Sequence, residues 1–248
     1  MVTDLLGSCL IWPDWPAPAN VRAFSTTRQG GFSQSPWAGL NLGGNSGDNP
    51  RDVEKNRQLL DKILPSRPHW LRQVHGTHVV NPDSGDAAAV EADAATAMTA
   101  GQVCAILTAD CLPVLLCDRA GTKVAAAHAG WRGLANGVLE ATVAAMDCPP
   151  RELLAWLGPA IGPNAFEVGQ DVFDIFIQAD TENASAFRPY RDRWLADLYA
   201  LARLALARVG FQDITGGRYC TYSEPDRFFS YRRDGETGRM ATMIWLVD

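Results

Sequence analysis

Two histidines and one cysteine, His75, Cys111 and His128, have side chains that bind transition metals. They are separated by 36 and 17 residues, which is too far for a local zinc-finger loop. Each lies at the end of a short apolar segment, so three different strand ends would have to bring them together. A thiolate and two imidazoles suit Zn²⁺ and leave a fourth position open for water. The spacing alone leaves a second interpretation open, in which the histidines are structural and Cys111 is a buried thiol.

The segment AAAHAGWRG, residues 125–133, surrounds His128 with small residues. An imidazole ring that turns towards a metal needs nearby backbone without bulky side chains, and alanine and glycine provide it. A catalytic zinc ion lowers the pKa of its bound water from ~15.7 towards ~7, which makes hydroxide available at neutral pH. The local composition therefore favours a metal site at His128.

The segments that carry these residues predict a fold that mixes strands and helices. The run VCAILTADCLPVLLCD predicts two buried strands that flank a bend at residues 109–111, because proline is poorly tolerated within a central strand. TKVAAAHA, just after it, predicts another strand. The remaining strands are expected in the segments HWLRQVHG, THVVNP and LLAWLG.

Helices are predicted where apolar residues recur at helical spacing. Asn49 followed by Pro50 is typical of a helix start and predicts a helix over residues 50–64. Residues 192–210 predict the clearest helix, with Trp194 on its apolar face. Further helices are expected directly after GWRG and in VGQDVFDIFIQA, and a C-terminal hairpin is expected around Asp234-Gly235.

Composition limits the class of protein and its partners. The 248 residues are 47% hydrophobic and 20% charged, as in a soluble globular protein. The net charge of −6 offers no broad basic surface for nucleic acid or an anionic membrane, although a local basic cluster can still bind an anion. No apolar run is long enough to cross a bilayer, and the N-terminus has an acid, Asp4, where a secretory signal is basic. We therefore expect a cytoplasmic protein with reduced cysteines.

Several longer motifs follow one another along the chain: RQVHG, TADCLPVLLCD, HAGWRG, LGPAIGP and FFSYRRDGETGR. With FSTTRQGG and NLGGNSGDN they span roughly residues 20–245. This set resembles the YfiH or laccase-domain family, formerly a domain of unknown function. The resemblance implies that His75, Cys111 and His128 bind zinc in an active site. It also implies one α+β domain over residues 1–248, a layered α/β/β/α sandwich with two central sheets, present as a monomer.

The same resemblance implies a zinc-dependent enzyme that acts on purine nucleosides. The implied reactions are phosphorolysis of adenosine, inosine, guanosine and methylthioadenosine, and deamination of adenosine. In deamination, zinc-bound hydroxide would attack the purine C6 while a nearby carboxylate moves the proton. Asp93 and Asp110 are the candidate proton carriers. Asp110 could equally orient a ligand histidine or cap a turn.

Phosphorolysis also needs a site for the attacking phosphate. Arg72 and Arg132 lie close to the two candidate histidines and could pair with phosphate through their guanidinium forks. Arg232 could reach a ligand and Phe228 could stack on a base. The alternatives are exposed arginines and a buried phenylalanine. NLGGNSGDN is too loose to count as a phosphate-binding loop and is interpreted as a turn region.

Two other functions stay open from the sequence. The family also includes a peptidoglycan editing factor, so an amidase acting on a UDP-muramyl peptide is one alternative, with Cys111 as a candidate nucleophile. The other is a binding module stabilised by structural zinc, which would need a fourth ligand such as His78. A multicopper oxidase needs several paired-histidine clusters, and this chain has four histidines with no His-x-His pair. Copper is still an alternative occupant of the single site.

Overall fold

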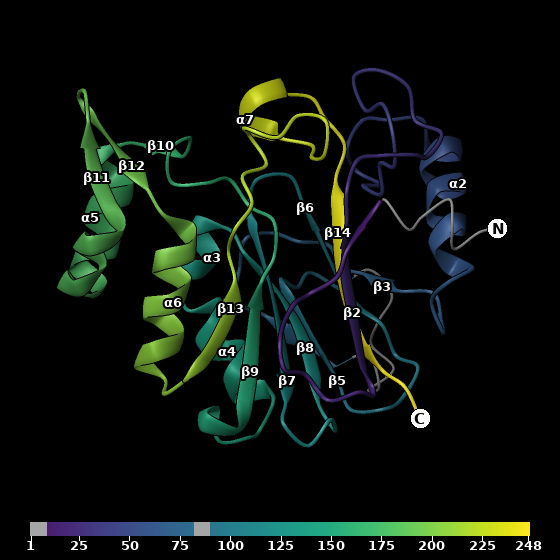
Figure 1. The fold of residues 1–248 in the computed structure, drawn as a ribbon. Coiled ribbons are helices and arrows are strands. Elements are labelled where there is room, and N and C mark those ends of the chain that lie inside the picture. Colours follow the sequence, from purple (N-terminus) through teal and green to yellow (C-terminus); the bar gives the residue numbers. More distant parts are fainter. Residues whose placement is uncertain (1–8, 82–89) are drawn as a thin grey trace.

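Two β-sheets pack face to face in the computed structural model, which describes residues 9–81 and 90–248 (Figure 1). Side chains from both sheets form one apolar cluster between them. The six-stranded sheet contains, in spatial order, β13 (Asp213–Gly216), β9 (Leu153–Leu157), β7 (Leu112–Asp118), β8 (Val124–Ala129), β5 (Ala94–Ala97) and β4 (Val79–Val80). The five-stranded sheet contains β1 (Leu10–Ile11), β2 (Val21–Thr26), β14 (Met240–Leu246), β6 (Cys104–Thr108) and β3 (His69–Trp70).

Strand β7 shows why its sequence is apolar at nearly every position. Leu115 and Cys117 face the other sheet, whereas Leu112, Val114 and Leu116 face a layer of helices. Since both faces of the strand are covered, the usual alternation of apolar and polar residues disappears. The predicted pair of strands around the bend at 109–111 is confirmed as β6 and β7, and the two belong to different sheets.

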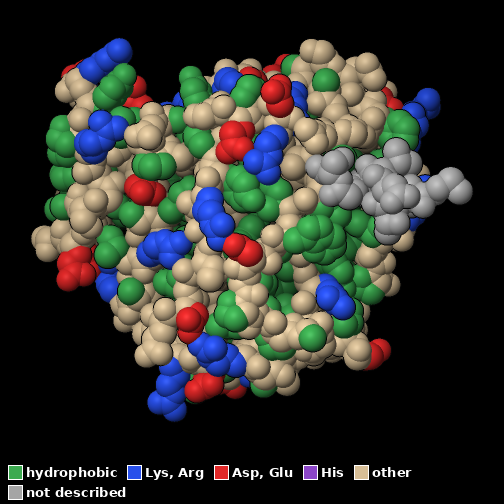
Figure 2. All heavy atoms as spheres, in the orientation of Figure 1, with side chains coloured by type: hydrophobic (Ala, Val, Ile, Leu, Met, Phe, Trp, Pro, Cys, Tyr) green, Lys and Arg blue, Asp and Glu red, His purple; other side chains and the backbone are tan. Residues whose placement is uncertain are grey.

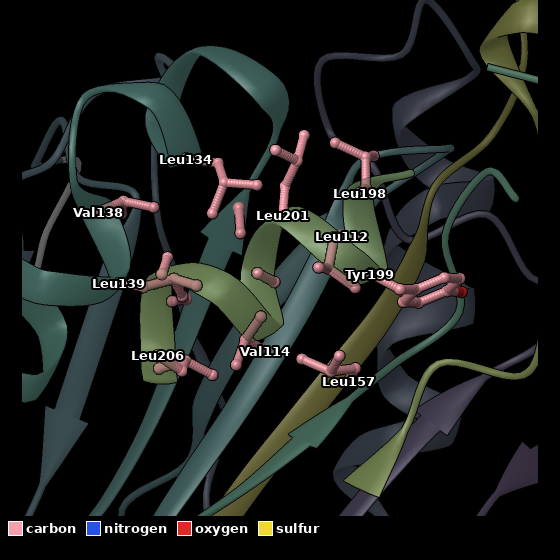
Figure 3. Packing of buried hydrophobic residues seen from close by; sticks show 14 of the residues in the cluster. Leu112, Val114, Leu134, Val138, Leu139, Leu157, Leu198, Tyr199, Leu201 and Leu206 are labelled. Atoms are coloured by element: carbon pink, nitrogen blue, oxygen red, sulfur yellow. The ribbon is translucent and has the colours of Figure 1, made fainter. Parts of the chain in front are cut away.

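Helices cover the outer faces of both sheets. Helices α3 (Trp131–Ala135), α4 (Val138–Ala145) and α6 (Leu198–Arg208) pack on the six-stranded sheet, where their side chains meet those of β7 and β9 (Figure 3). Helix α2 (Pro50–Asp61) contributes Leu60 to the cluster on the outer face of the five-stranded sheet. The predicted start of α2 is confirmed, because Asn49 caps the helix and Pro50 is its first residue. The fold is α+β in a single domain, as predicted.

A third, three-stranded sheet was not expected from the sequence. It contains β10 (Glu167–Val168), β12 (Arg193–Ala196) and β11 (Phe187–Tyr190). It lies beside α5 (Gln170–Ala179), which was predicted, and a 3-10 segment, Thr181–Ala186. Trp194 therefore lies in a strand, and its ring stacks on Phe173 with centroids 3.9 Å apart. The prediction that residues 192–210 form one helix is wrong because Asp197 caps the backbone N–H groups of the next turn and α6 begins after it.

Two other local predictions are corrected by the structure. The helix expected after GWRG is divided into α3 and α4, because Gly137 adopts a left-handed conformation with φ of 91°. The C-terminal hairpin does not form. Residues Tyr231–Asp234 form a short helix, α7, and β14 pairs instead with β2 and β6 in the middle of the five-stranded sheet. The other short helical segment is a 3-10 turn at Pro150–Glu152.

The structure also tests the expectations about the cysteines, membrane-spanning segments and the charge of the surface. The six cysteines all lie in the described part of the chain, and none of them forms a disulfide bond there. No helix in the described part of the chain is long and apolar enough to cross a membrane. On the face drawn in Figure 2, basic and acidic side chains are interspersed and form no single charged patch. Asp4, on which the expectation of a missing signal rested, lies outside the described residues.

The segment that follows β9 is tied to α6 by one buried hydroxyl. The Tyr199 hydroxyl accepts a hydrogen bond from the Ala160 N–H at 2.8 Å and donates one to the Tyr219 carbonyl at 2.9 Å. Burial raises the pKa of Tyr199 well above its usual range, so the group stays a neutral phenol. This contact fixes the loop that carries Ile161 to the cavity described below.

Replacing Tyr199 by phenylalanine should lower the free energy of unfolding by about 1–3 kcal/mol, because the buried Ala160 N–H loses its partner. Urea unfolding followed by circular dichroism measures the change. The matched control is Tyr190→Phe on β11, which should change stability by no more than ~0.5 kcal/mol. Equal stability of the Tyr199 variant and the native protein would contradict the assignment.

Candidate metal centre

The three candidate ligands come from three separate segments and meet at one point. His75 lies between β3 and β4, Cys111 between β6 and β7, and His128 within β8. Their ligand atoms all lie within 4.8 Å of one another, and Cys111 Sγ is 3.7 Å from His75 Nε2. Sulfur and nitrogen ligands of one tetrahedral zinc ion are expected about 3.5 Å apart, from Zn–S near 2.3 Å and Zn–N near 2.0 Å. The donor set and its spacing fit a metal ion.

One buried carboxylate positions both histidines. Asp93 is completely buried, and its Oδ1 accepts a hydrogen bond from His128 Nδ1 at 2.8 Å. The same carboxylate accepts the backbone N–H groups of three consecutive residues, Val74, His75 and Gly76. These bonds hold His75 in a left-handed conformation with φ of 61°. Because Nδ1 of His128 is engaged, its Nε2 is left for the metal.

Cys111 is positioned by the residue before it. The chain passes from one sheet to the other here, and Asp110 adopts a φ of 89°, which is uncommon for a residue with a side chain. Its carboxylate accepts hydrogen bonds from the Thr221 hydroxyl at 2.6 Å and from the Arg232 N–H at 2.7 Å. Asp110 thus joins the bend to the C-terminal segment. The role of proton carrier for Asp93 or Asp110 stays a prediction, while the geometry gives both a positioning role.

Gly130 explains the small residues after His128. A Cβ atom at this position would lie 2.9 Å from His75 Cδ2 and 3.0 Å from Cys111 Sγ. The backbone φ of −60° is open to any residue, so only the lack of space requires glycine. The side chains of His75 and Cys111 therefore approach the backbone that follows His128 as closely as glycine allows.

The charges at the site stabilise one another. Burial opposes ionisation of the Cys111 thiol, but the adjacent His128 and His75 outweigh it and lower the pKa of the thiol to about 6. Burial also disfavours a charged His128, but Cys111 and Asp93 outweigh that effect and raise the pKa of His128 to about 9. Burial opposes ionisation of Asp93 as well, yet the hydrogen bonds from His128 and Gly76 lower the pKa of this carboxyl. The thiolate needed for metal binding is favoured near neutral pH.

The group holds three ligands within the described residues. His78, the candidate fourth ligand, is not one of them, and its carbonyl oxygen accepts the N–H groups of Asp93 and Ala94. Structural zinc sites usually have four protein ligands, whereas catalytic sites keep one position for water or substrate. A metal held here would keep a position open.

A cavity of about 770 Å³ adjoins the three ligands and contains three of the four predicted substrate-binding residues. Arg72 forms an ion pair with Glu91, and Arg132 lies over the Trp131 ring at 4.3 Å. Arg232 donates to the Glu167 carbonyl oxygen at 2.7 Å. The predicted contact of Phe228 with substrate does not fit the structure, because this side chain is completely buried between the sheets.

Sequence reasoning missed other residues that line the cavity, notably Arg57, Arg239 and Trp70, together with the Gly43-Gly44 turn. Arg57 lies on α2 and Arg239 just before β14, far from any candidate ligand along the chain. Arg239 directly follows a glycine in GETGR, whereas no glycine stands close to Arg57 or Trp70 in the sequence. Only the fold brings these residues together with the Gly43-Gly44 turn.

Comparison with known proteins identifies the family. A family model described as multi-copper polyphenol oxidoreductase laccase matches residues 22–247. The chain belongs to this family. The described residues of this chain form one group of three possible metal ligands. The family description therefore does not define the metal or the reaction.

Individual members of the laccase family resemble the chain over nearly its whole length. The purine nucleoside phosphorylase YfiH of Escherichia coli is 55% identical, over 97% of this chain and 100% of that protein. A protein of Pseudomonas aeruginosa named purine nucleoside phosphorylase is 56% identical, over 95% and 98%. The crystal structure of a Neisseria meningitidis protein superposes with a TM-score of 0.94 at 55% identity, over 97% and 100%. YlmD of Geobacillus stearothermophilus gives 0.86 at 30%, over 96% of each chain.

Gly130→Ala should weaken zinc binding at least tenfold, because the added methyl group displaces His75 or Cys111. Competition with a chromophoric chelator measures the affinity. Gly76→Ala is the matched control, since its Cβ would meet nothing closer than 3.5 Å, and it should bind zinc like the native protein. Native affinity in Gly130→Ala would contradict the proposed packing of the ligands.

Asp93→Asn should weaken zinc binding by about 10–100-fold, the usual effect of losing an outer partner of a ligating histidine. A neutral amide oxygen cannot accept hydrogen bonds from His128 and three N–H groups together, because the second oxygen has become a donor. The same chelator competition measures the loss. Unchanged affinity in the folded variant would show that Asp93 does not position the ligands.

Proposed function

We propose that the protein is a zinc-dependent purine nucleoside phosphorylase, acting on adenosine, inosine, guanosine and methylthioadenosine. The observation that carries the proposal is the His75–Cys111–His128 group beside a cavity rich in arginines. The printed names of the relatives in Escherichia coli and Pseudomonas aeruginosa support this choice of substrate. Zinc is the proposed metal because its preferred ligands are thiolate and imidazole, with copper as the alternative occupant.

The residues that line the cavity include groups suited to bind the phosphate, the purine and a metal ion during phosphorolysis. Phosphate oxygen forms a bond to ribose C1′ while the bond from C1′ to the purine nitrogen breaks and its electron pair leaves with the base. Guanidinium groups bind the phosphate and hold it in line with that bond. Trp131 and Phe166 line the cavity and are the aromatic residues proposed to contact the purine. Zinc bound by His75, Cys111 and His128 would supply a Lewis acid beside these groups.

Adenosine deamination is proposed as a second reaction of the same site. The open ligand position favours it, because a hydrolytic reaction needs a place to bind and activate water. Asp93 already accepts four hydrogen bonds, so taking up a proton would require it to give up a partner, whereas Asp110 accepts two and keeps acceptor capacity. Phosphorolysis is the main proposal, because the printed names of the relatives give that reaction.

The test is an assay of the zinc-loaded protein with inosine or adenosine, with and without phosphate. We expect free base and ribose 1-phosphate only when phosphate is present, with any deamination of adenosine independent of phosphate. His75→Ala and Cys111→Ala should lower the rate by roughly 10²-fold or more, as the loss of other transition-state-stabilising groups does. Cys148→Ala removes a thiol outside the site and should keep the native rate.

Failure of this assay has a definite consequence. Folded protein with a full complement of zinc that releases neither base nor inosine would contradict the nucleoside proposal. Release of an amino acid from a UDP-muramyl peptide would then support the amidase. If both assays are silent and Cys111→Ala lowers the thermal stability, the non-enzymatic zinc-stabilised module gains support.

A further inference from the structure

We propose that Arg57, Arg239 and the backbone of Gly44 and Asn45 form the phosphate subsite of the cavity. The sequence alone predicted Arg72 and Arg132 as the phosphate-binding residues, and the glycine-rich segment was interpreted as a turn region. The inference rests on the proposed function only in naming orthophosphate as a co-substrate. The binding site itself is argued from the described contacts.

The two arginines converge on one turn. A Cβ atom on Gly43 would lie 2.6 Å from Arg239 Cγ, and one on Gly44 would lie 3.3 Å from Arg57 Nη2. Both side chains and both glycines line the cavity that contains the metal ligands. Glycine lets the Arg57 guanidinium and the aliphatic part of Arg239, from segments 182 residues apart, approach the same short stretch of backbone.

Each guanidinium is held in place by backbone carbonyl oxygens. Arg57 donates through Nε and Nη2 to the Leu42 carbonyl, at 3.1 and 2.8 Å, and lies over the Trp70 ring at 4.3 Å. Arg239 donates through Nη1 to the carbonyls of Thr237 and Gly238, at 2.7 and 2.9 Å. Neither residue spends all five of its N–H donors on these bonds. The remaining donors are oriented before any ligand binds, which lowers the entropy lost on binding.

The charge of neither arginine is paired with a carboxylate in the part of the chain that the structure describes. Glu54 and Asp61, whose charges act on Arg57, form ion pairs with Arg67 instead. No carboxylate in residues 9–81 or 90–248 forms an ion pair with Arg57 or Arg239, whereas Arg72 already has Glu91. Burial lowers the pKa of both guanidinium groups, which shows that water solvates their charges poorly. A dianion would supply the missing charge.

The turn itself offers further donors. Its shape is fixed by Asn41, whose side-chain oxygen accepts the N–H of Gly43 at 3.0 Å and that of Arg239 at 2.9 Å. Within the described residues the N–H groups of Gly44 and Asn45 have no hydrogen-bond partner. Successive free N–H groups in a turn form a concave anion-binding surface. Both arginines and the residues that carry these two amides line the same cavity.

The subsite adjoins the metal centre. Arg239 lines the same cavity as Cys111 and Asp110, and the charges of these two groups oppose the lowering of its pKa by burial. Asp110 accepts hydrogen bonds from the Thr221 hydroxyl and the Arg232 N–H and forms no ion pair with Arg239. A phosphate held by Arg239 would therefore lie beside the metal. The base would bind in the part of the same cavity that Trp131 and Phe166 line.

The phosphoryl chemistry has two possible sources, free orthophosphate or the diphosphate of a nucleotide-linked substrate. We assign orthophosphate, because the N–H donors that Arg57 and Arg239 keep at this turn are enough to bind one phosphate group but not the two groups of a diphosphate. Isothermal titration of the zinc-loaded full chain with orthophosphate, and separately with UDP, distinguishes the two. We expect orthophosphate to bind and UDP to bind at least tenfold more weakly.

The variants for this titration are Arg57→Gln and Arg239→Gln, which should each weaken orthophosphate binding at least tenfold. Arg203→Gln is the matched control, because Arg203 also donates to two backbone carbonyls, of Ile214 and Gly216, but lies away from the cavity. Arg57→Lys and Arg239→Lys keep the charge and should lose less affinity than the glutamine variants. Thermal unfolding identifies any variant that is not folded. If a glutamine variant does not fold, the affinity of the corresponding lysine variant for orthophosphate tests the subsite instead.

Three outcomes would overturn the assignment: no orthophosphate binding by the native protein, native affinity in both folded glutamine variants, or tighter binding of UDP. Steady-state kinetics gives an independent reading, since the KM for phosphate should rise in both variants while the KM for inosine stays within about twofold. A protein that binds orthophosphate through Arg57 and Arg239 but cleaves no nucleoside would support this subsite and contradict the proposed function.

Discussion

The buried carboxylate of Asp93 is the interaction on which the metal centre depends. An ionised group with no exposed surface is stable only when hydrogen bonds replace the lost water. Asp93 has four such bonds, one from the His128 ring and three from the backbone that carries His75. One charge therefore sets the orientation of a ligand on β8 and the backbone conformation of a ligand in a distant loop.

The third ligand depends on the way the two sheets are connected. Strands β6 and β7 are consecutive in sequence but belong to different sheets, so the chain must turn sharply at residues 109–111. Asp110 adopts an unusual backbone conformation there and is held by Thr221 and the Arg232 N–H. The same turn thus presents Cys111 to the histidines and fixes the C-terminal segment at the cavity. The turn that connects the two packed sheets consequently also determines the position of Cys111 relative to the two histidines.

Local patterns predicted the parts of this arrangement that depend on neighbouring residues. Apolar runs identified β6, β7 and β8, and Asn49-Pro50 identified the start of α2. Strand burial and helix capping can be predicted in this way because both depend on residues that are neighbours in the sequence. The prediction for Trp194 was wrong because the strand pairing that overrides its helical spacing comes from Phe187–Tyr190 and Glu167–Val168. The expected hairpin was wrong for the same reason, since the partners of β14 are β2 and β6. The candidate ligands could be named from residue type and family resemblance, but their common carboxylate required the fold.

The arginines show the same limit for function. The whole chain is acidic, with a net charge of −6, yet among the described residues five arginines and one acid, Asp110, line the cavity, and Asp110 is already hydrogen-bonded. Net charge describes the average surface, whereas a ligand experiences the local charges and their poor solvation. Arg57 and Arg239 escaped sequence reasoning because each looks ordinary in its own segment. They become a binding site only where α2, the Gly43-Gly44 turn and the start of β14 meet, which places an anion next to a metal-binding thiolate.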